Sequence, residues 1–356
     1  MLQVRWLTSA RTHAIVRHRI PSRTRHIARF AWLGPLALVF VHRQSCFTPC
    51  VQDDFFKKGW KHERSSALGM ISAETYMAHT DLWQWSPRPH YDNLLDQEKH
   101  SLVGKQLATA LIASQKSVVV FVERPYLLEF VRAVGQAETV PFVLVAVETR
   151  DAPLTLDLQE QIMALRGLRV CFATNLHKPK DTGIFRPLPL GLSSRRVLHR
   201  EPLILDVKRS ALPWAQRDRR LLVPPMMMRG RMRKHFITVL SSEPYRHLAR
   251  VVRGPMLFDD FMGLLSEHQS VLSPVGRGYD CYRTWEALAV GSVPLVVSDA
   301  SFDQRLYANG PCYIPRPDQL SPEILTEVLA QLGDPSQHAH EVEVRYWKGV
   351  WASYLT

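Results

Sequence analysis

The stretch VLSPVGRGYDCYRTWEALAVGSVPLVV, residues 271–297, predicts a strand, a glycine loop, a helix and a second strand. Gly276 and Gly278 form the loop, and Asp280 after them is expected to cap the helix. The helix should end at Gly291, because glycine suits a left-handed C-terminal cap. An apolar run then returns the chain to the sheet. A strand, a helix and a strand in succession predict a parallel α/β sheet.

The same alternation extends in both directions along the chain. Strands are predicted at 117–122, 141–147, 168–174 and 187–192, and again at 221–223, 247–252, 269–272 and 293–298. The runs of the first group are largely apolar rather than alternating, which indicates strands that are buried on both faces of a parallel sheet. The charged stretch Ser193–Arg220 between the two groups predicts a connection with a surface helix. We therefore expect two doubly wound domains, at 65–195 and 196–335, and a C-terminal helix at 336–356.

The first 52 residues differ from the rest in charge. The chain carries a net charge of +12, and eight arginines precede its first acidic residue, Asp53. This leader therefore holds +8, and the body holds the remaining +4. A mildly basic body gives no support to a nucleic-acid-binding protein and suits an enzyme with anionic substrates.

An apolar run at Phe30–Val41 follows the basic part of the leader. It is shorter than the roughly 20 residues that span a bilayer, and it fits the core of a signal peptide or a short signal anchor. Secretory entry would place the body in the lumen of the Golgi or endoplasmic reticulum, with type II membrane anchoring through 30–41. An arginine-rich leader is equally typical of import into a mitochondrion or plastid, and an unstructured tail or a mispredicted start also stays open.

The loop at 276–278 suits a diphosphate group. A glycine loop that leads into a helix offers free backbone N–H groups and the positive end of the helix dipole. Arg277 and Arg283 add positive charge, and a guanidinium can hold phosphate oxygens through two hydrogen bonds. Glu286 lies in an otherwise apolar helix, so its carboxylate needs partners. The hydroxyls of a nucleotide ribose would serve, and so would Arg283 one turn earlier in the helix.

The combination of these features resembles a known family. The segments SPVG, DCYRTWEA and GSVPLVV within 271–297 are similar to exostosin-like glycosyltransferases, and closest to the C-terminal domain of the ribitol xylosyltransferase type. Fainter likeness is found in Cys171–Arg195 and Arg229–Arg233, and the whole similarity covers Phe142–Leu320. The resemblance implies a GT-B fold, in which two Rossmann-like domains face a cleft. It also implies transfer of a sugar from a nucleotide-sugar donor, expected to be UDP-linked, to a hydroxyl of a glycan or glycoprotein.

The resemblance assigns roles to particular residues. Gly276, Arg277 and Gly278 would line the donor diphosphate, while Arg283 would neutralise the leaving nucleotide and Glu286 would hold the ribose. The expected donor-binding set is completed by Ser273, Asp280, Tyr282, Arg231 and Arg233. Arg231 and Arg233 could equally form a solvated basic surface.

The reaction needs a group that neutralises the leaving diphosphate and a base for the acceptor hydroxyl. The chain has no Asp-x-Asp motif and no C-x-x-C pair, so we expect no metal site, no cofactor and metal-independent chemistry. Transfer with inversion needs a general base, and Glu148 and Asp151 follow the strand predicted at 141–147. Both carboxylates could instead form a loop salt bridge or a cap. A non-catalytic glycan-binding or scaffold protein with the same fold is the alternative.

Overall fold

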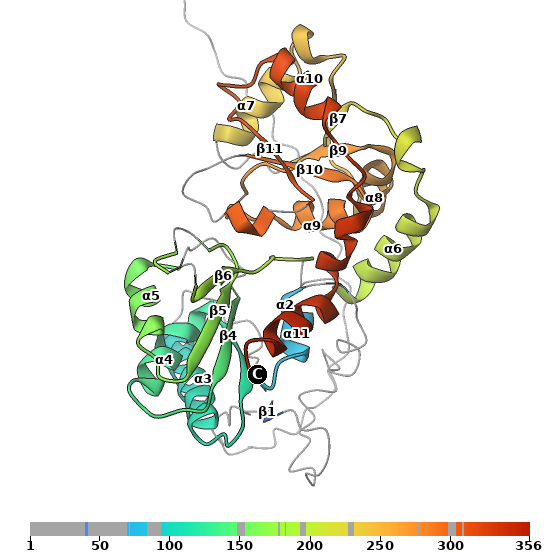
Figure 1. Ribbon diagram of the computed structural model, residues 1–356. Helices are drawn as coiled ribbons and strands as arrows, with labels where there is room; N and C mark the ends of the chain where they lie inside the picture. The colour runs from blue at the N-terminus through green and yellow to red at the C-terminus, as the bar shows by residue number, and fades with distance from the viewer. Residues whose placement is uncertain are drawn as a thin grey trace, which may run out of the picture. The chain divides into compact units, whose positions relative to one another are not determined.

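Two parallel sheets with flanking helices make up the part of the chain that the structure describes (Figure 1). The computed structural model describes residues 40–41, 70, 72–83, 94–147, 154–176, 179–181, 183–192, 197–226, 231–276, 278–297, 304–307 and 310–356. All of these lie in one unit that spans Ala37–Thr356. The predicted fold class, an α/β chain with two halves built on parallel sheets, is confirmed. No helix of the described residues is long and apolar enough to cross a membrane.

The first sheet has its strands in chain order. They are β1 (Phe40–Val41), β2 (Leu82–Trp83), β3 (Val118–Glu123), β4 (Phe142–Val147), β5 (Leu168–Ala173) and β6 (Phe185–Pro187). β1 and β2 pair antiparallel, and every other neighbouring pair is parallel. β1 comes from the end of the apolar run in the predicted leader, and the rest of residues 1–52 lies outside the described residues.

Chain order places the crossover helices of the first sheet on one face, because such crossovers are right-handed. These helices are α3 (Leu94–Ile112), α4 (Arg124–Val134) and α5 (Leu156–Met163), whose buried side chains form one core with alternate residues of β3 and β4. The opposite face is covered by α2 (Ala73–Ala78) and by α11 (Val344–Ala352) at the end of the chain (Figure 1). Trp347 and Tyr354 contact the Phe172 ring of β5, so the C-terminal helix packs on the first sheet.

The second sheet has the order β11-β10-β9-β7-β8, and all its pairs are parallel. Its strands are β7 (Leu221–Val223), β8 (Ala249–Val251), β9 (Ser270–Leu272), β10 (Val293–Val297) and β11 (Cys312–Ile314). α7 (Arg231–Leu240) and α10 (Pro322–Ala330) share one core with the sheet, while α8 (Phe258–Glu267) and α9 (Tyr282–Ala289) belong to the core on its other face. Helices on both faces are the signature of a doubly wound sheet.

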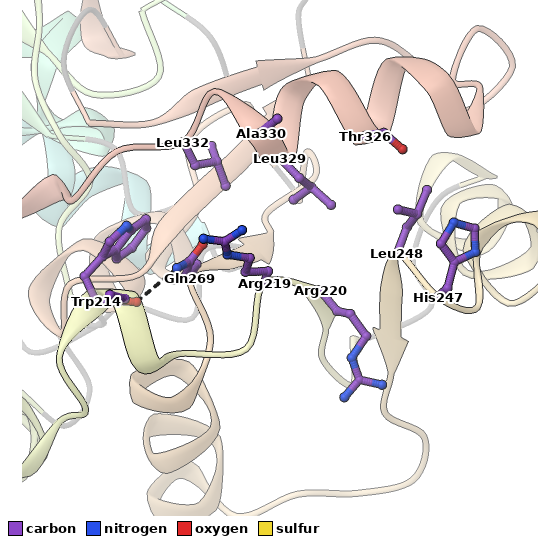
Figure 2. A pocket seen from close by; sticks show the side chains of 11 residues that line it. Trp214, Arg219, Arg220, His247, Leu248, Gln269, Thr326, Leu329, Ala330 and Leu332 are labelled. Atoms are coloured by element: carbon purple, nitrogen blue, oxygen red, sulfur yellow. Dashed lines mark hydrogen bonds between the residues drawn. The ribbon is translucent and has the colours of Figure 1, made fainter.

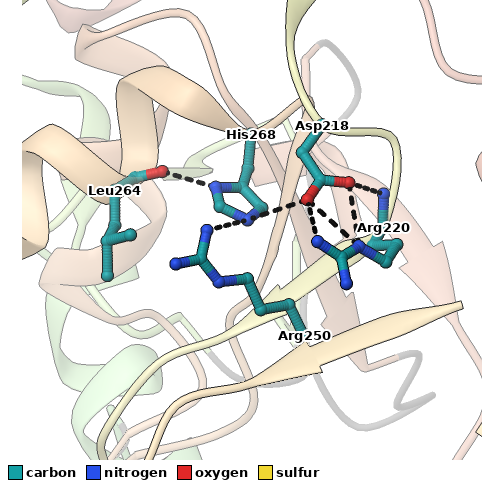
Figure 3. Close-up of polar contacts among 5 residues, drawn as sticks. All are labelled: Asp218, Arg220, Arg250, Leu264 and His268. Carbon is teal, nitrogen blue, oxygen red and sulfur yellow. Dashed lines mark hydrogen bonds and ion pairs between the residues drawn. The ribbon is translucent and has the colours of Figure 1, made fainter. Parts of the chain in front are cut away.

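The segment between the sheets matches the prediction of a connection with a helix. It contains α6 (Val197–Ser210) and the short helix η3 (Trp214–Gln216). The charged run that follows is anchored at the amino ends of the second sheet's strands. Asp218 receives hydrogen bonds from Arg220 and faces the buried His268, whose Nδ1 bonds to Leu264 O at 2.8 Å (Figure 3). This cluster lies at the amino ends of β7 and β9, whereas the glycine loop follows the carboxyl end of β9.

The structure differs from the prediction at several elements. β6 occupies Phe185–Pro187 rather than 187–192, because Pro187 and Pro189 have no N–H to continue the ladder. β11, a short edge strand between Pro311 and Pro315, was not predicted at all. The tail predicted as one helix is divided into the 3-10 helix η6 (Pro335–Val342) and α11.

Candidate functional site

The predicted site lies where the strand order of the second sheet reverses. β7 and β9 are neighbours, but the helices that follow them, α7 and α9, pack on opposite faces of the sheet. Their connecting loops therefore part beyond the carboxyl ends of the two strands. In open α/β sheets this switch point is where ligands bind. The loop from Ser273 to Asp280 leaves β9 at this point, and Arg233 stands in the first turn of α7.

Arg233 packs against the glycine loop. Its side chain is only 8% exposed, and its Nε donates to the carbonyl of Val275 at 3.0 Å. A Cβ atom on Gly276 would lie 2.7 Å from Arg233 Nη2, which is too close. Any residue other than glycine would therefore displace the guanidinium from its present position. Arg231, two residues earlier, is exposed. Of the two arginines predicted here, the structure brings only Arg233 to the loop.

Gly278 lies against Asn175, which follows β5 of the first sheet. A Cβ atom on Gly278 would stand 2.5 Å from Asn175 Oδ1 and 2.8 Å from its Cγ. The same Oδ1 accepts a hydrogen bond from the backbone N–H of Asp280 at 3.0 Å. Asn175 has a φ of +49°, a left-handed conformation that asparagine tolerates better than most residues. Asn175 therefore joins the carboxyl end of β5 to the loop that follows β9.

Asp280 does not cap α9 as predicted. The N-cap is Cys281, whose side chain makes no capping hydrogen bond to the helix. The Asp280 carboxylate is instead buried, where it accepts hydrogen bonds from Leu190 N–H at 2.6 Å, from Tyr307 Oη at 2.7 Å and from Trp285 Nε1 at 2.8 Å. The prediction failed because the sequence shows a carboxylate before a helix but not the donors that surround it.

Arg283 is a buried cation in the first turn of α9. Its Nε is buried and has no hydrogen-bond partner among the described residues. Burial lowers the pKa of this guanidinium, and the positive charge of Arg233 nearby lowers it further. A buried guanidinium nitrogen without a partner is costly, and in a native protein it points to a missing anion or water. The first turn of α9, whose N-cap side chain makes no capping hydrogen bond, adds the positive end of the helix dipole beside it.

Glu286 forms its ion pair with a residue that neither sequence-based reading named. Its Oε1 accepts from Arg200 Nη1 of α6 at 2.8 Å, and no ion pair links Glu286 to Arg283 in the described part of the chain. Arg200 also lies 3.9 Å above the centre of the Phe258 ring of α8. Burial raises the pKa of Glu286, whereas the charges of Arg200 and Arg283 act in the opposite direction. Binding of a ribose by Glu286 stays a prediction.

The remaining predicted residues have varied surroundings. Ser273 is buried, and its hydroxyl shares a hydrogen bond of 2.9 Å with Thr284 in α9. Tyr282 is half-buried at the first position of α9. Arg277, Glu148 and Asp151 lie outside the described residues. The described strand β4 ends at Val147, next to β5 and one position before Glu148 in the sequence.

A pocket of about 320 Å³ opens elsewhere, at the amino ends of the second sheet's strands (Figure 2). Its walls include the Trp214 ring, the leucines at the end of α10 and the polar side chains of Arg219 and Gln269. None of the predicted site residues lines this pocket. Its position at the wrong end of the strands separates it from the switch point.

Three contributors to the site were not found from the sequence. Arg200, Leu190 and Tyr307 come from segments far from the glycine loop, and only the tertiary fold brings them to Glu286 or Asp280. No local pattern marks them. Asn175 could be named from the sequence as a residue that orients substrate or caps a turn, because it follows a buried strand, where site residues gather.

Comparison with known proteins yields structural neighbours but no sequence relatives. No protein-family model matches the sequence, and no curated protein matches it significantly. Two α,α-trehalose-phosphate synthase (UDP-forming) structures from Burkholderia xenovorans are similar. One has a TM-score of 0.42 and 12% identity and covers 76% of this chain and 80% of its own. The other, in complex with glucose-6-phosphate, has a TM-score of 0.38 and 11% identity and covers 74% and 79%.

A third neighbour is the corresponding enzyme of Burkholderia multivorans, with a TM-score of 0.40, 11% identity, and coverage of 74% of this chain and 75% of its own. At these scores and identities the likeness assigns no activity to this chain. The function has to rest on the site itself.

Proposed function

We propose that this protein is a glycosyltransferase that takes a sugar from a nucleotide-sugar donor, UDP-linked, and attaches it to a hydroxyl of a glycan or glycoprotein. One observation carries the proposal. Among the described residues, the buried Arg283 Nε has no hydrogen-bond partner, and it lies near Arg233 at the N-terminus of α9, at the switch point of a doubly wound sheet. A pyrophosphate supplies the negative charge and the acceptor oxygens that this arrangement lacks.

The chemistry follows from the position of the cations. Transfer breaks the bond between the anomeric carbon and the diphosphate, and negative charge grows on the departing oxygen. Arg283, Arg233 and the first N–H groups of α9 would stabilise that charge without a metal ion. In the same step the acceptor oxygen bonds to the anomeric carbon and gives its proton to a base. We assign the base to Glu148 or Asp151, and an attack opposite the leaving group inverts the anomeric centre.

The resemblance of residues 271–297 to exostosin-like enzymes supports the same proposal at a finer level. It suggests the branch that includes ribitol xylosyltransferases, and therefore a hexose or pentose as the transferred sugar. A secretory leader would place the enzyme in the Golgi or endoplasmic reticulum, with membrane anchoring through 30–41. Organelle import remains the alternative localisation.

The proposal is tested by binding and turnover together. A panel of nucleotides and nucleotide sugars is screened by thermal shift, in which a ligand at 100 times its Kd adds about 2.7 kcal/mol of stability. We expect a shift selective for UDP and UDP-sugars, and release of UDP from the sugar donor that survives EDTA. Arg283→Ala should weaken UDP binding and abolish turnover. Arg231→Ala is the matched control, because it removes an exposed arginine from the first turn of α7, the helix that also carries Arg233.

Three outcomes would count against the proposal. If no nucleotide changes the melting temperature, the proposed donor site is refuted. Binding of UDP-sugar without turnover in the presence of glycan acceptors would favour the non-catalytic glycan-binding alternative. Loss of activity with EDTA, while the fold stays intact, would refute the metal-independent chemistry.

A further inference from the structure

Asp280 connects the two halves of the chain through one carboxylate and one backbone amide. Its Oδ2 accepts from Leu190 N–H at 2.6 Å, in the segment that follows β6 of the first sheet. Its own N–H donates to Asn175 Oδ1 at 3.0 Å, beyond the end of β5. Two hydrogen bonds from one residue of the glycine loop therefore reach the first half.

The same carboxylate also holds two segments of the second half. Trp285 Nε1 lies 2.8 Å from Oδ1 and 2.9 Å from Oδ2, and Tyr307 Oη lies 2.7 Å from Oδ1. The Trp285 and Tyr307 rings are themselves buried side by side, with centroids 6.2 Å apart. A carboxylate offers acceptor sites only, and the surrounding protein donors use both of its oxygens.

These contacts leave Asp280 little capacity to bind a donor directly. Its side chain is 2% exposed, and a carboxylate would repel the phosphates of a nucleotide sugar. Asp280 does, however, directly precede α9 and is hydrogen-bonded to it. The residue after it, Cys281, is the N-cap, and the bond to Trp285 fixes the rotation of the helix that carries Arg283.

We propose that Asp280 is a positioning residue, which holds the glycine loop and Arg283 in place for the donor by tying α9 to the Leu190 and Asn175 segments of the first half. This inference rests on the proposed function, because it assumes an anionic donor at Arg283. It assigns Asp280 an action through Arg283 rather than a contact with the nucleotide.

A double-mutant cycle on the full chain, with UDP as the probe, tests this assignment. Asp280→Asn leaves one acceptor oxygen where the protein donors now use two. At least one of the hydrogen bonds to the side chain is therefore lost. We expect it to raise the Kd for UDP about tenfold in the wild-type background and less than about twofold in the Arg283→Ala background, because coupled residues are not additive. Asp218→Asn, the same chemical change at the opposite edge of the sheet, should leave the Kd unchanged.

The outcomes separate the possible roles. Equal fold-changes in both backgrounds would show that Asp280 acts independently of Arg283, and would overturn the inference. A lower melting temperature with an unchanged Kd would show a purely structural residue, and would also overturn it. If Asp280→Asn does not fold, Asn175→Gly carries the same cycle, since it removes the acceptor of the Asp280 N–H and tolerates the positive φ. A wild-type protein that binds no UDP refutes the proposed function itself.

Discussion

A methyl group added at Gly278 should break the contact between the glycine loop and Asn175. In the wild type, the position of that Cβ lies 2.5 Å from Asn175 Oδ1, 2.8 Å from Cγ and 3.0 Å from Nδ2. The amide must withdraw by roughly an ångström to reach ordinary van der Waals separation. Its Oδ1 is already 3.0 Å from Asp280 N, so a withdrawal of this size away from the loop would break that hydrogen bond.

The cost of Gly278→Ala has two parts. Overpacking of a close-packed contact costs about 1–3 kcal/mol, and the lost hydrogen bond costs about 0.5–1.5 kcal/mol. Urea unfolding at equilibrium measures the sum, which we expect to be about 2–4 kcal/mol. Gly263→Ala in α8 is the control, because no atom lies within 4 Å of its Cβ. That substitution should be neutral or stabilise by up to about 1 kcal/mol, through helix propensity.

The cost of Gly278→Ala in free energy of unfolding can be compared between the wild type and the Asn175→Gly variant. In Asn175→Gly the amide that meets the methyl group is absent. Gly278→Ala should therefore cost at least about 1 kcal/mol less there than in the wild type. An equal cost in both backgrounds would mean that the destabilisation arises elsewhere in the loop.

Three further predictions concern charge and packing. Burial raises the pKa of Asp280 from its ordinary value of 3.8 to about 6. Between these values the folded chain keeps a proton that the unfolded chain has released, so stability should fall by about 3 kcal/mol as pH rises from about 4 to about 6. Asp280→Asn should flatten this slope in urea unfolding series, and an unchanged slope would contradict it. Arg200→Gln leaves the buried Glu286 without its cation and should cost about 3–5 kcal/mol, much of it recovered in the double variant with Glu286→Gln. Trp351→Ala should cost about 3–5 kcal/mol in calorimetry, because this fully buried ring fastens α11 to α2, and a loss below about 1 kcal/mol would refute that packing.

The alternation of strands and helices was predictable because the strands are buried on both faces. Runs such as 142–147 are apolar without interruption, and their short length and β-branched residues indicate a buried strand rather than a helix. The glycine loop and its place before α9 were predictable for the same local reasons. Short elements were not. β11 spans only Cys312–Ile314 and lies at a sheet edge, where the hydrophobic signal is weakest.

Long-range polar contacts could not be predicted from local patterns. The sequence suggested that Gly276 and Gly278 line a donor diphosphate. It gave no sign that a Cβ atom at these positions would lie 2.7 Å from Arg233 Nη2 and 2.5 Å from Asn175 Oδ1. The sequence predicted that the buried carboxylate of Glu286 needs a hydrogen-bonding partner, and the structure provides one. Its partner Arg200 lies 86 positions away, where spacing rules for helices say nothing.

The central claim is that the cations around α9 bind the pyrophosphate of a sugar nucleotide. Isothermal titration of UDP into the wild type, Arg233→Ala and Arg231→Ala tests it most directly. The account predicts that Arg233→Ala weakens binding by about 10- to 100-fold, as expected for a charged hydrogen bond to phosphate, while Arg231→Ala changes the Kd less than about twofold. Equal losses in the two variants, or no binding of UDP to the wild type, would contradict it.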